Sequence, residues 1–251
     1  MHFKSLSAVA ALFFLSLAET RPGSVLTSSL YDASISGTSG TPGAISNDLW
    51  CGFVQKAAVR SVSAVWIVPN VSLPDSGSQG DYEIFQWVGI DGAAPSKCND
   101  VLLQGGTSQK FYQGQYTTDF WYEFYNPQQT PSLHVTYPPL RIGDQVRVTV
   151  TATSAYAGTI SFENLTQNIS DTQNVTSAVP LCFENVEWIS EAPTKQLPNF
   201  EAFDFSEVSA VRDDGSSING DGSEEWYLDS PAAKCHASLQ DGGSTISFSQ
   251  S

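Results

Sequence analysis

Residues 145–153 read Gln-Val-Arg-Val-Thr-Val-Thr-Ala-Thr (QVRVTVTAT), and this stretch decides the fold class. Every second side chain is apolar, which puts four of them on one face of an extended chain: Val146, Val148, Val150 and Ala152. A period of two is typical of a strand with one buried face. Because the turn signal Gly143-Asp144 precedes it, we predict a half-buried antiparallel strand.

Similar short runs recur along the chain and are separated by turn residues: 64–68, 84–90, 101–104, 120–125, 159–163, 186–190 and 203–211. No window sustains an apolar period of 3.6 over ten residues, so we expect no long helix. Many short strands with turn punctuation predict an all-β sandwich or barrel. Residues 49–251 contain no repeat and no linker, which favours a single domain.

The composition excludes several classes of function. The 251 residues carry 11 Lys and Arg against 26 Asp and Glu, a formal net charge of −15. Such a surface repels phosphate backbones and anionic lipid, so we expect neither nucleic-acid nor membrane binding. No CxxC or HExxH spacing occurs, and we expect no metal and no cofactor. The two histidines after residue 2, His134 and His236, are interpreted as surface or packed residues.

The N-terminal segment has the pattern of an export signal. Met1 to Lys4 is followed by a short apolar run from Leu6 to Ala18, too short to span a bilayer. We predict a signal peptide over 1–18 and a Ser-, Thr-, Gly- and Pro-rich leader over 19–48. The folded domain is then expected over 49–251, in a secreted, extracellular and monomeric protein.

Sequons and cysteines agree with export. Four Asn-X-Ser/Thr sequons occur, and the last three form a cluster that suggests an exposed loop: Asn70, Asn164, Asn168 and Asn174. The cysteines are even in number and widely spaced, which predicts two disulfides and leaves three pairings open: Cys51, Cys98, Cys182 and Cys235.

Several strings, taken together and in order, resemble the glutamic peptidases (eqolisins, peptidase family G1), secreted acid endopeptidases of fungi. The most specific are Gln86-Trp-Val-Gly-Ile-Asp-Gly92, Leu102-Leu-Gln-Gly-Gly106 and Val186-Glu-Trp-Ile-Ser-Glu191, within a match over about 50–210. The resemblance implies a sandwich of two antiparallel sheets, of concanavalin or lectin type. It also implies a disulfide between Cys98 and Cys182, and with it a second one between Cys51 and Cys235.

The resemblance further implies a catalytic pair, Gln104 and Glu191, acting on protein or peptide substrates. Family residues that line the substrate cleft fall on Trp87, Asp91, Asp119, Trp121 and Glu123. A carboxyl with a pKa near 4 stays partly ionised in acid, so Glu191 is expected to activate water. The Gln104 amide is expected to stabilise the oxyanion. Such an enzyme should be insensitive to pepstatin.

Two other functions remain open. Abundant aromatic residues and the Trp121-Tyr-Glu123 string also suit a carbohydrate-active sandwich, either a lectin or a glycoside hydrolase with two carboxylates. An inactive family member that only binds peptides is a third reading, which the presence of both catalytic residue types disfavours. Protein digestion at pH 3 beside a polysaccharide panel separates these alternatives.

Overall fold

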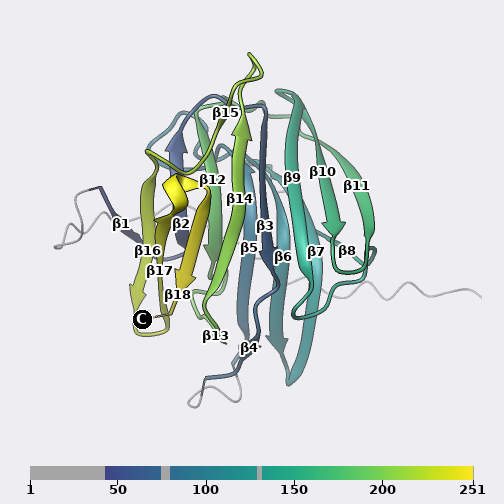
Figure 1. The fold of residues 1–251 in the computed structure, drawn as a ribbon, viewed down its shortest axis with the longest axis vertical. Helices are drawn as coiled ribbons and strands as arrows, with labels where there is room; N and C mark the ends of the chain where they lie inside the picture. The colour runs from purple at the N-terminus through teal and green to yellow at the C-terminus, as the bar shows by residue number, and fades with distance from the viewer. Residues whose placement is uncertain (1–42, 75–79, 129–131, 251) are drawn as a thin grey trace, which may run out of the picture.

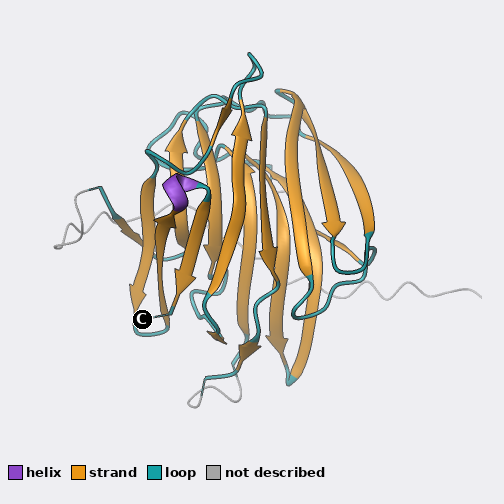
Figure 2. Ribbon diagram, in the orientation of Figure 1, coloured by secondary structure: helices purple, strands orange, loops and turns teal. Residues whose placement is uncertain are grey.

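The computed structural model describes residues 43–74, 80–128 and 132–250, and these are almost entirely β-structure (Figure 2). Within this part of the chain, the one helical element is a short 3₁₀ turn at Asp241–Gly243. The predicted signal peptide and most of the predicted leader lie outside the described residues. No helix in the described part is long and apolar enough to cross a membrane.

The strands form two layers. The first layer, in spatial order, contains β11 (Ile169–Thr176), β10 (Ala157–Asn164), β9 (Gln145–Ser154), β3 (Ser61–Ile67), β14 (Phe203–Val211), β18 (Thr245–Ser249) and β17 (Ala233–Gln240). The second contains β16 (Glu224–Ser230), β2 (Trp50–Lys56), β12 (Asn185–Glu191), β5 (Tyr82–Ile90), β6 (Leu102–Tyr112), β7 (Gln115–Tyr125) and β8 (Leu133–Val135). Strand β17 pairs with both β18 and β16, so one continuous ribbon of strands folds over on itself.

Figure 1 shows β3, β9 and β14 in front of β5 and β6. All pairings between these fourteen strands are antiparallel, which confirms the predicted two-sheet sandwich. Four short strands complete the fold: β1 (Ile45–Asn47), β4 (Val71–Ser72), β13 (Asn199–Phe200) and β15 (Ser217–Ile218).

The main core fills the space between the layers. Strand β9 turns its four alternating apolar residues, at most 5% exposed, into this core, as the sequence predicts. The indole N–H groups of Trp66 and Trp188 cross between the layers, donating to Thr107 Oγ1 and to the Ser63 carbonyl. The rings of Phe120 and Phe162 meet across the same space with centroids 5.0 Å apart. Apolar burial of this extent is the main term that stabilises such a sandwich.

A second apolar cluster covers the opposite face of the second layer. It contains Trp50, Val54, Phe85, Trp87, Ala93, Leu102, Trp121, Ile189 and Trp226. Trp50 packs edge-on against Trp87 and tilted against Trp226, with centroids 5.0 and 5.5 Å apart. We call this surface the outer face. Because both faces of β5, β6 and β12 are covered, most residues of these strands are buried, polar ones included, and their burial does not alternate.

Both disulfides form as the resemblance implies, Cys98 with Cys182 and Cys51 with Cys235. The folded region, however, begins before the predicted boundary at residue 49. Strand β1 pairs in parallel with Trp226–Leu228 of β16. The sequence does not reveal this strand, because a ladder of backbone hydrogen bonds needs no apolar side chains.

The predicted exposed loop around the clustered sequons is wrong. These sequons lie on the antiparallel hairpin β10–β11, and Asn164 is fully buried. The Asn164 amide donates to the Pro139 carbonyl at 3.0 Å and to Asp144 Oδ2 at 2.7 Å. An amide nitrogen held in this way has no room for a glycan in the folded chain. Asn70, Asn168 and Asn174 are exposed.

Candidate active site

Alternation along four strands places the predicted site residues on the outer face. On β6, Thr107 points into the core, so Gln104, an odd number of residues (three) earlier on the strand, points outward. On β12, Trp188 points into the core, so Glu187 and Glu191 point outward. The same reasoning puts outward Phe85 and Trp87 on β5, and Asp119, Trp121 and Glu123 on β7.

The strand register arranges these side chains in rows across the sheet. The first row runs Glu191, Phe85, Ser108, Asp119, and the last runs Glu187, Gly89, Gln104, Glu123. Between them lies the row Ile189, Trp87, Gly106, Trp121. The two predicted catalytic residues therefore occupy different strands and different rows, with a tryptophan row between them.

Trp87 connects the two rows. Its indole Nε1 donates to Glu191 Oε2 at 2.8 Å. The Cζ3 edge of the same ring lies 2.9 Å from where a Cβ on Gly89 would be, and Gly89 pairs directly with Gln104. A larger residue than glycine at position 89 would therefore displace the indole. The fully buried Trp87 ring thus binds the Glu191 carboxyl and packs beside Gly89, the residue of β5 that pairs with Gln104.

Gln104 is fixed by its neighbour on β7. Its Nε2 donates to Glu123 Oε2 at 3.0 Å, and the side chain is only 6% exposed. One amide hydrogen makes this bond and the second remains available. Gly106, two residues on, lacks the side chain that would collide with the Gln86 backbone, which explains the glycine after Gln104-Gly105 in this string.

Burial raises the pKa of both outer-face carboxyls near Trp87. The pKa of Glu191 rises to about 8, chiefly by burial, and the carboxylates of Glu123 and Glu83 raise it further, whereas the hydrogen bond from Trp87 lowers it. The pKa of Glu123 rises to about 7 for the same chief reason, opposed by the hydrogen bond from Gln104. Both groups therefore carry protons in acid. The expectation that Glu191 is partly ionised near pH 4 is wrong for this site.

Glu187 differs from Glu191 in its surroundings, although both lie on the same face. Glu187 is fully buried, and neither carboxyl oxygen has a hydrogen-bond partner among the described residues. Burial and the nearby Asp91 carboxyl hold the pKa of Glu187 well above its ordinary value, so the group is neutral. Glu191 is only half-buried and is oriented by Trp87. Of the two, Glu191 is the carboxyl that water can reach.

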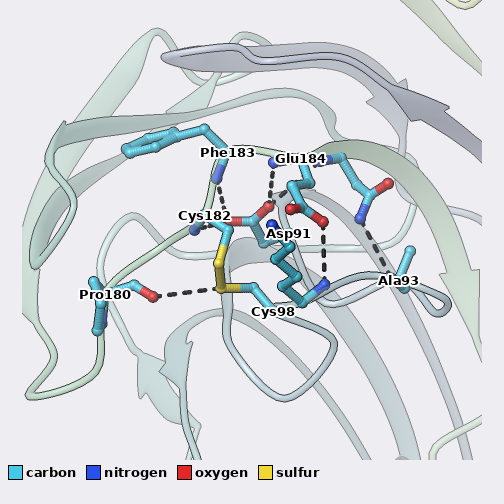
Figure 3. The surroundings of a disulfide bond; sticks show 9 residues. Asp91, Ala93, Cys98, Pro180, Cys182, Phe183 and Glu184 are labelled. Atoms are coloured by element: carbon cyan, nitrogen blue, oxygen red, sulfur yellow. Dashed lines mark hydrogen bonds between the residues drawn. A yellow bond between two sulfur atoms is a disulfide. The ribbon is translucent and has the colours of Figure 1, made fainter.

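The carboxyl of Asp91, a predicted cleft residue, is held by backbone N–H groups. Asp91 is fully buried, and its carboxyl oxygens accept the backbone N–H groups of residues 182, 183, 184 and 185 at 2.7 to 3.3 Å. Figure 3 shows this cradle beside the Cys98–Cys182 disulfide. Asp91 thus fixes the backbone that leads into β12, the strand that carries Glu191. Its role in the structure is to position that strand.

The structure also places on the outer face a charged group that the sequence does not single out. Lys110 Nζ lies 3.6 Å from Glu83 Oε1, 3.4 Å from His134 Nε2 and 5.0 Å from the centroid of the Phe85 ring. These residues come from β5, β6 and β8, and only the strand register reveals that they meet. No group of three potential metal ligands occurs within residues 43–74, 80–128 and 132–250.

The peptidase A4 family model matches residues 48–248. The chain belongs to the peptidase A4 family. This peptidase A4 member is 34% identical over 162 residues to aspergillopepsin-2 of Aspergillus niger, and 36% identical over 135 residues to scytalidopepsin B of Scytalidium lignicola. These matches cover 57% and 52% of the chain, and 55% and 46% of the relatives, so the chain spans about half the length of the curated relatives that it matches.

Solved structures agree with this membership. Scytalido-glutamic peptidase, crystallised with a transition state analog inhibitor, superposes with a TM-score of 0.67 at 27% identity, covering 81% of this chain and 98% of that one. Aspergilloglutamic peptidase from Aspergillus niger gives 0.57 at 28% identity, over 68% and 99%. The resemblance to glutamic peptidases is thereby confirmed, and with it the sandwich fold.

Proposed function

We propose that this peptidase A4 member is a secreted acid endopeptidase that cleaves proteins with Gln104 and Glu191. The observation that carries the proposal is the bridge formed by Trp87, whose indole binds Glu191 and lies over the strand position paired with Gln104. Family membership supports peptide hydrolysis over the carbohydrate-active alternative. Two disulfides support an oxidising, extracellular setting.

The protonation of Glu191 defines how it activates water. Below neutral pH the carboxyl is neutral, because its pKa is raised to about 8. A neutral carboxyl can act at both oxygens: one accepts a proton from the attacking water, while the other gives its own proton to the scissile amide nitrogen. The water oxygen bonds to the carbonyl carbon, the C–N bond breaks, and Glu191 ends with one proton, as it began.

Gln104 supplies the oxyanion contact. Its Nε2 has one hydrogen bonded to Glu123 and one free, and the amide is uncharged throughout the acid range. The free N–H donates to the carbonyl oxygen as negative charge develops there. Loss of one such donor typically costs about 3–4 kcal/mol in the transition state. Glu123 holds the amide so that it reaches the transition state without reorganisation.

Digestion of a denatured protein at pH 3, with and without pepstatin, tests the proposal beside a polysaccharide panel. We expect pepstatin-insensitive cleavage into peptides and no release of sugar. Release of sugar without proteolysis would instead support the hypothesis that the protein is a carbohydrate-active enzyme.

A further inference from the structure

Two basic residues, Lys110 and His134, lie close together on the outer face near Glu191. Phe85 pairs directly with Glu191, and the Lys110 ammonium lies 5.0 Å above the centroid of the Phe85 ring. His134 on β8 pairs with Trp121, and its Nε2 lies 3.4 Å from Lys110 Nζ. Lys110 is half-buried and His134 is exposed, so a bound peptide can reach both.

Acid changes the charge of this group in one direction. At neutral pH the Glu83 carboxylate pairs with Lys110, and a neutral His134 ring can accept a hydrogen bond from the ammonium. Asp119, which faces the pair from β7, adds a second negative charge. In acid His134 becomes a cation beside the Lys110 ammonium. Two positive charges then lie side by side, and the ion pair that the structure shows for them is the one from Lys110 to Glu83.

We propose that Lys110 and His134 form an anion-binding subsite that selects substrates with an acidic side chain close to the scissile bond. An anion between the two cations would relieve their repulsion and replace Glu83 as the partner of Lys110. The inference rests on the proposed function, because Glu191 defines the position of the scissile bond. It concerns the preference among peptides, not the bond-breaking step.

His134 titrates in the range where this change matters. Burial lowers its pKa, the neighbouring Lys110 lowers it further, and Asp119 raises it. The imidazolium therefore forms only on the acid side of its ordinary value. A carboxylate substrate loses its own charge below about pH 4, whereas a sulfonate stays charged. A cysteic acid side chain, which carries a sulfonate, thus reports on the enzyme groups alone.

The test compares peptides that differ only in cysteic acid or glutamine, at each position around the cleaved bond, between pH 3 and pH 7. We expect kcat/KM to favour one cysteic acid peptide by about fivefold at pH 4, the size of a partly exposed ion pair, and to favour neither at pH 7. Lys110→Gln and His134→Gln should each reduce the preference to below twofold. Lys234→Gln, an equal charge change on the distant strand β17, should leave it intact.

Binding separates this inference from the proposed function. In Glu191→Gln, which should not cleave, the affinity for the cysteic acid peptide at pH 4 should exceed that for the glutamine peptide, and Lys110→Gln should remove the difference. An unchanged preference in Lys110→Gln, or an equal loss in Lys234→Gln, overturns the subsite. Absence of cleavage by the wild type with Lys110-dependent binding intact overturns the peptidase proposal and leaves the subsite standing.

Discussion

The indole N–H of Trp87 donates to Glu191 Oε2 at 2.8 Å, across 104 positions of sequence. The bond leaves one oxygen of the carboxyl, Oε1, unused by Trp87, and it fixes the orientation of the carboxyl on the outer face. The same ring packs over Gly89, the residue paired with Gln104. One buried side chain thus binds Glu191 and packs at the position of β5 that pairs with Gln104.

Replacing either member of the pair should abolish proteolysis at pH 3. Glu191→Gln removes the transferable proton and should lower kcat by about 10²–10⁴-fold. Gln104→Glu replaces the amide donor and should lower it by about 10²–10³-fold. Glu187→Gln is the matched control, and we expect normal cleavage because no Glu187 oxygen has a partner among the described residues. If Glu187→Gln is inactive while Glu191→Gln still cleaves, the catalytic carboxyl is that of Glu187, near the start of β12, and the assignment to Glu191 is wrong.

The pH dependence of kcat/KM should report the ionisation of Glu191. If the neutral carboxyl is the active form, activity falls as pH rises toward the pKa of about 8. Glu83 raises that pKa by its charge, so Glu83→Gln should move the basic limb of the profile to lower pH. A basic limb that moves to higher pH in Glu83→Gln would contradict the neutral-carboxyl mechanism. So would a kcat/KM that rises as pH approaches about 8.

Stability should be highest in acid and fall as pH rises above about 4.5. Raised carboxyl pKa values mean that the folded chain holds more protons than the unfolded chain between about pH 4.5 and 8, so the free energy of unfolding decreases with pH there. Each such group contributes up to about 1.4 kcal/mol per pH unit. Glu187→Gln, which keeps the shape of the neutral acid, should raise the melting temperature at pH 7 and leave it unchanged at pH 4. Thermal scans from pH 3 to 8 measure this slope; an equal slope in the variant would show that Glu187 is not protonated in the fold.

Asp91→Asn should destabilise the fold although Asp91 touches neither proposed catalytic residue. An amide has one acceptor oxygen, so it cannot hold all four backbone N–H groups of residues 182–185. Leaving buried donors unpaired typically costs about 1–3 kcal/mol each, and we expect a loss of about 2–4 kcal/mol in urea unfolding. The exposed Asp214→Asn is the control and should change stability by less than about 0.5 kcal/mol. A neutral outcome for Asp91→Asn would mean that the cradle does not hold the entry to β12.

Glycan mapping of the secreted protein should find Asn164 unmodified. Its amide is buried against Asp144 and Pro139, whereas Asn168 and Asn174 on the same hairpin are exposed. We expect any glycans of this cluster on the latter two. A glycan on Asn164 in correctly folded protein would contradict the packing of the β9–β10 end.

The fold class follows from the amino-acid sequence, because alternation in 145–153 is a local property that requires one buried face. The proposed catalytic residues Gln104 and Glu191 are also predicted locally, since they stand within the short runs Leu102–Gly106 and Val186–Glu191. What each polar group contacts depends instead on the three-dimensional fold. In the sequence, nothing distinguishes Asp91, Asn164 and Glu187 from exposed polar residues. In the structure all three are buried.

The physical reason is that burial and pKa depend on residues brought together across strands. The pKa of Glu191 is raised mainly by burial within the folded sheet, and further by Glu123 and Glu83, which the strand register brings close from β7 and β5. Lys110 on β6 contacts His134 on β8 because both strands pair with β7 and the two side chains approach each other across it. Such neighbours follow from the pairing of whole strands, and pairing depends on backbone hydrogen bonds and core packing that no short run of sequence encodes.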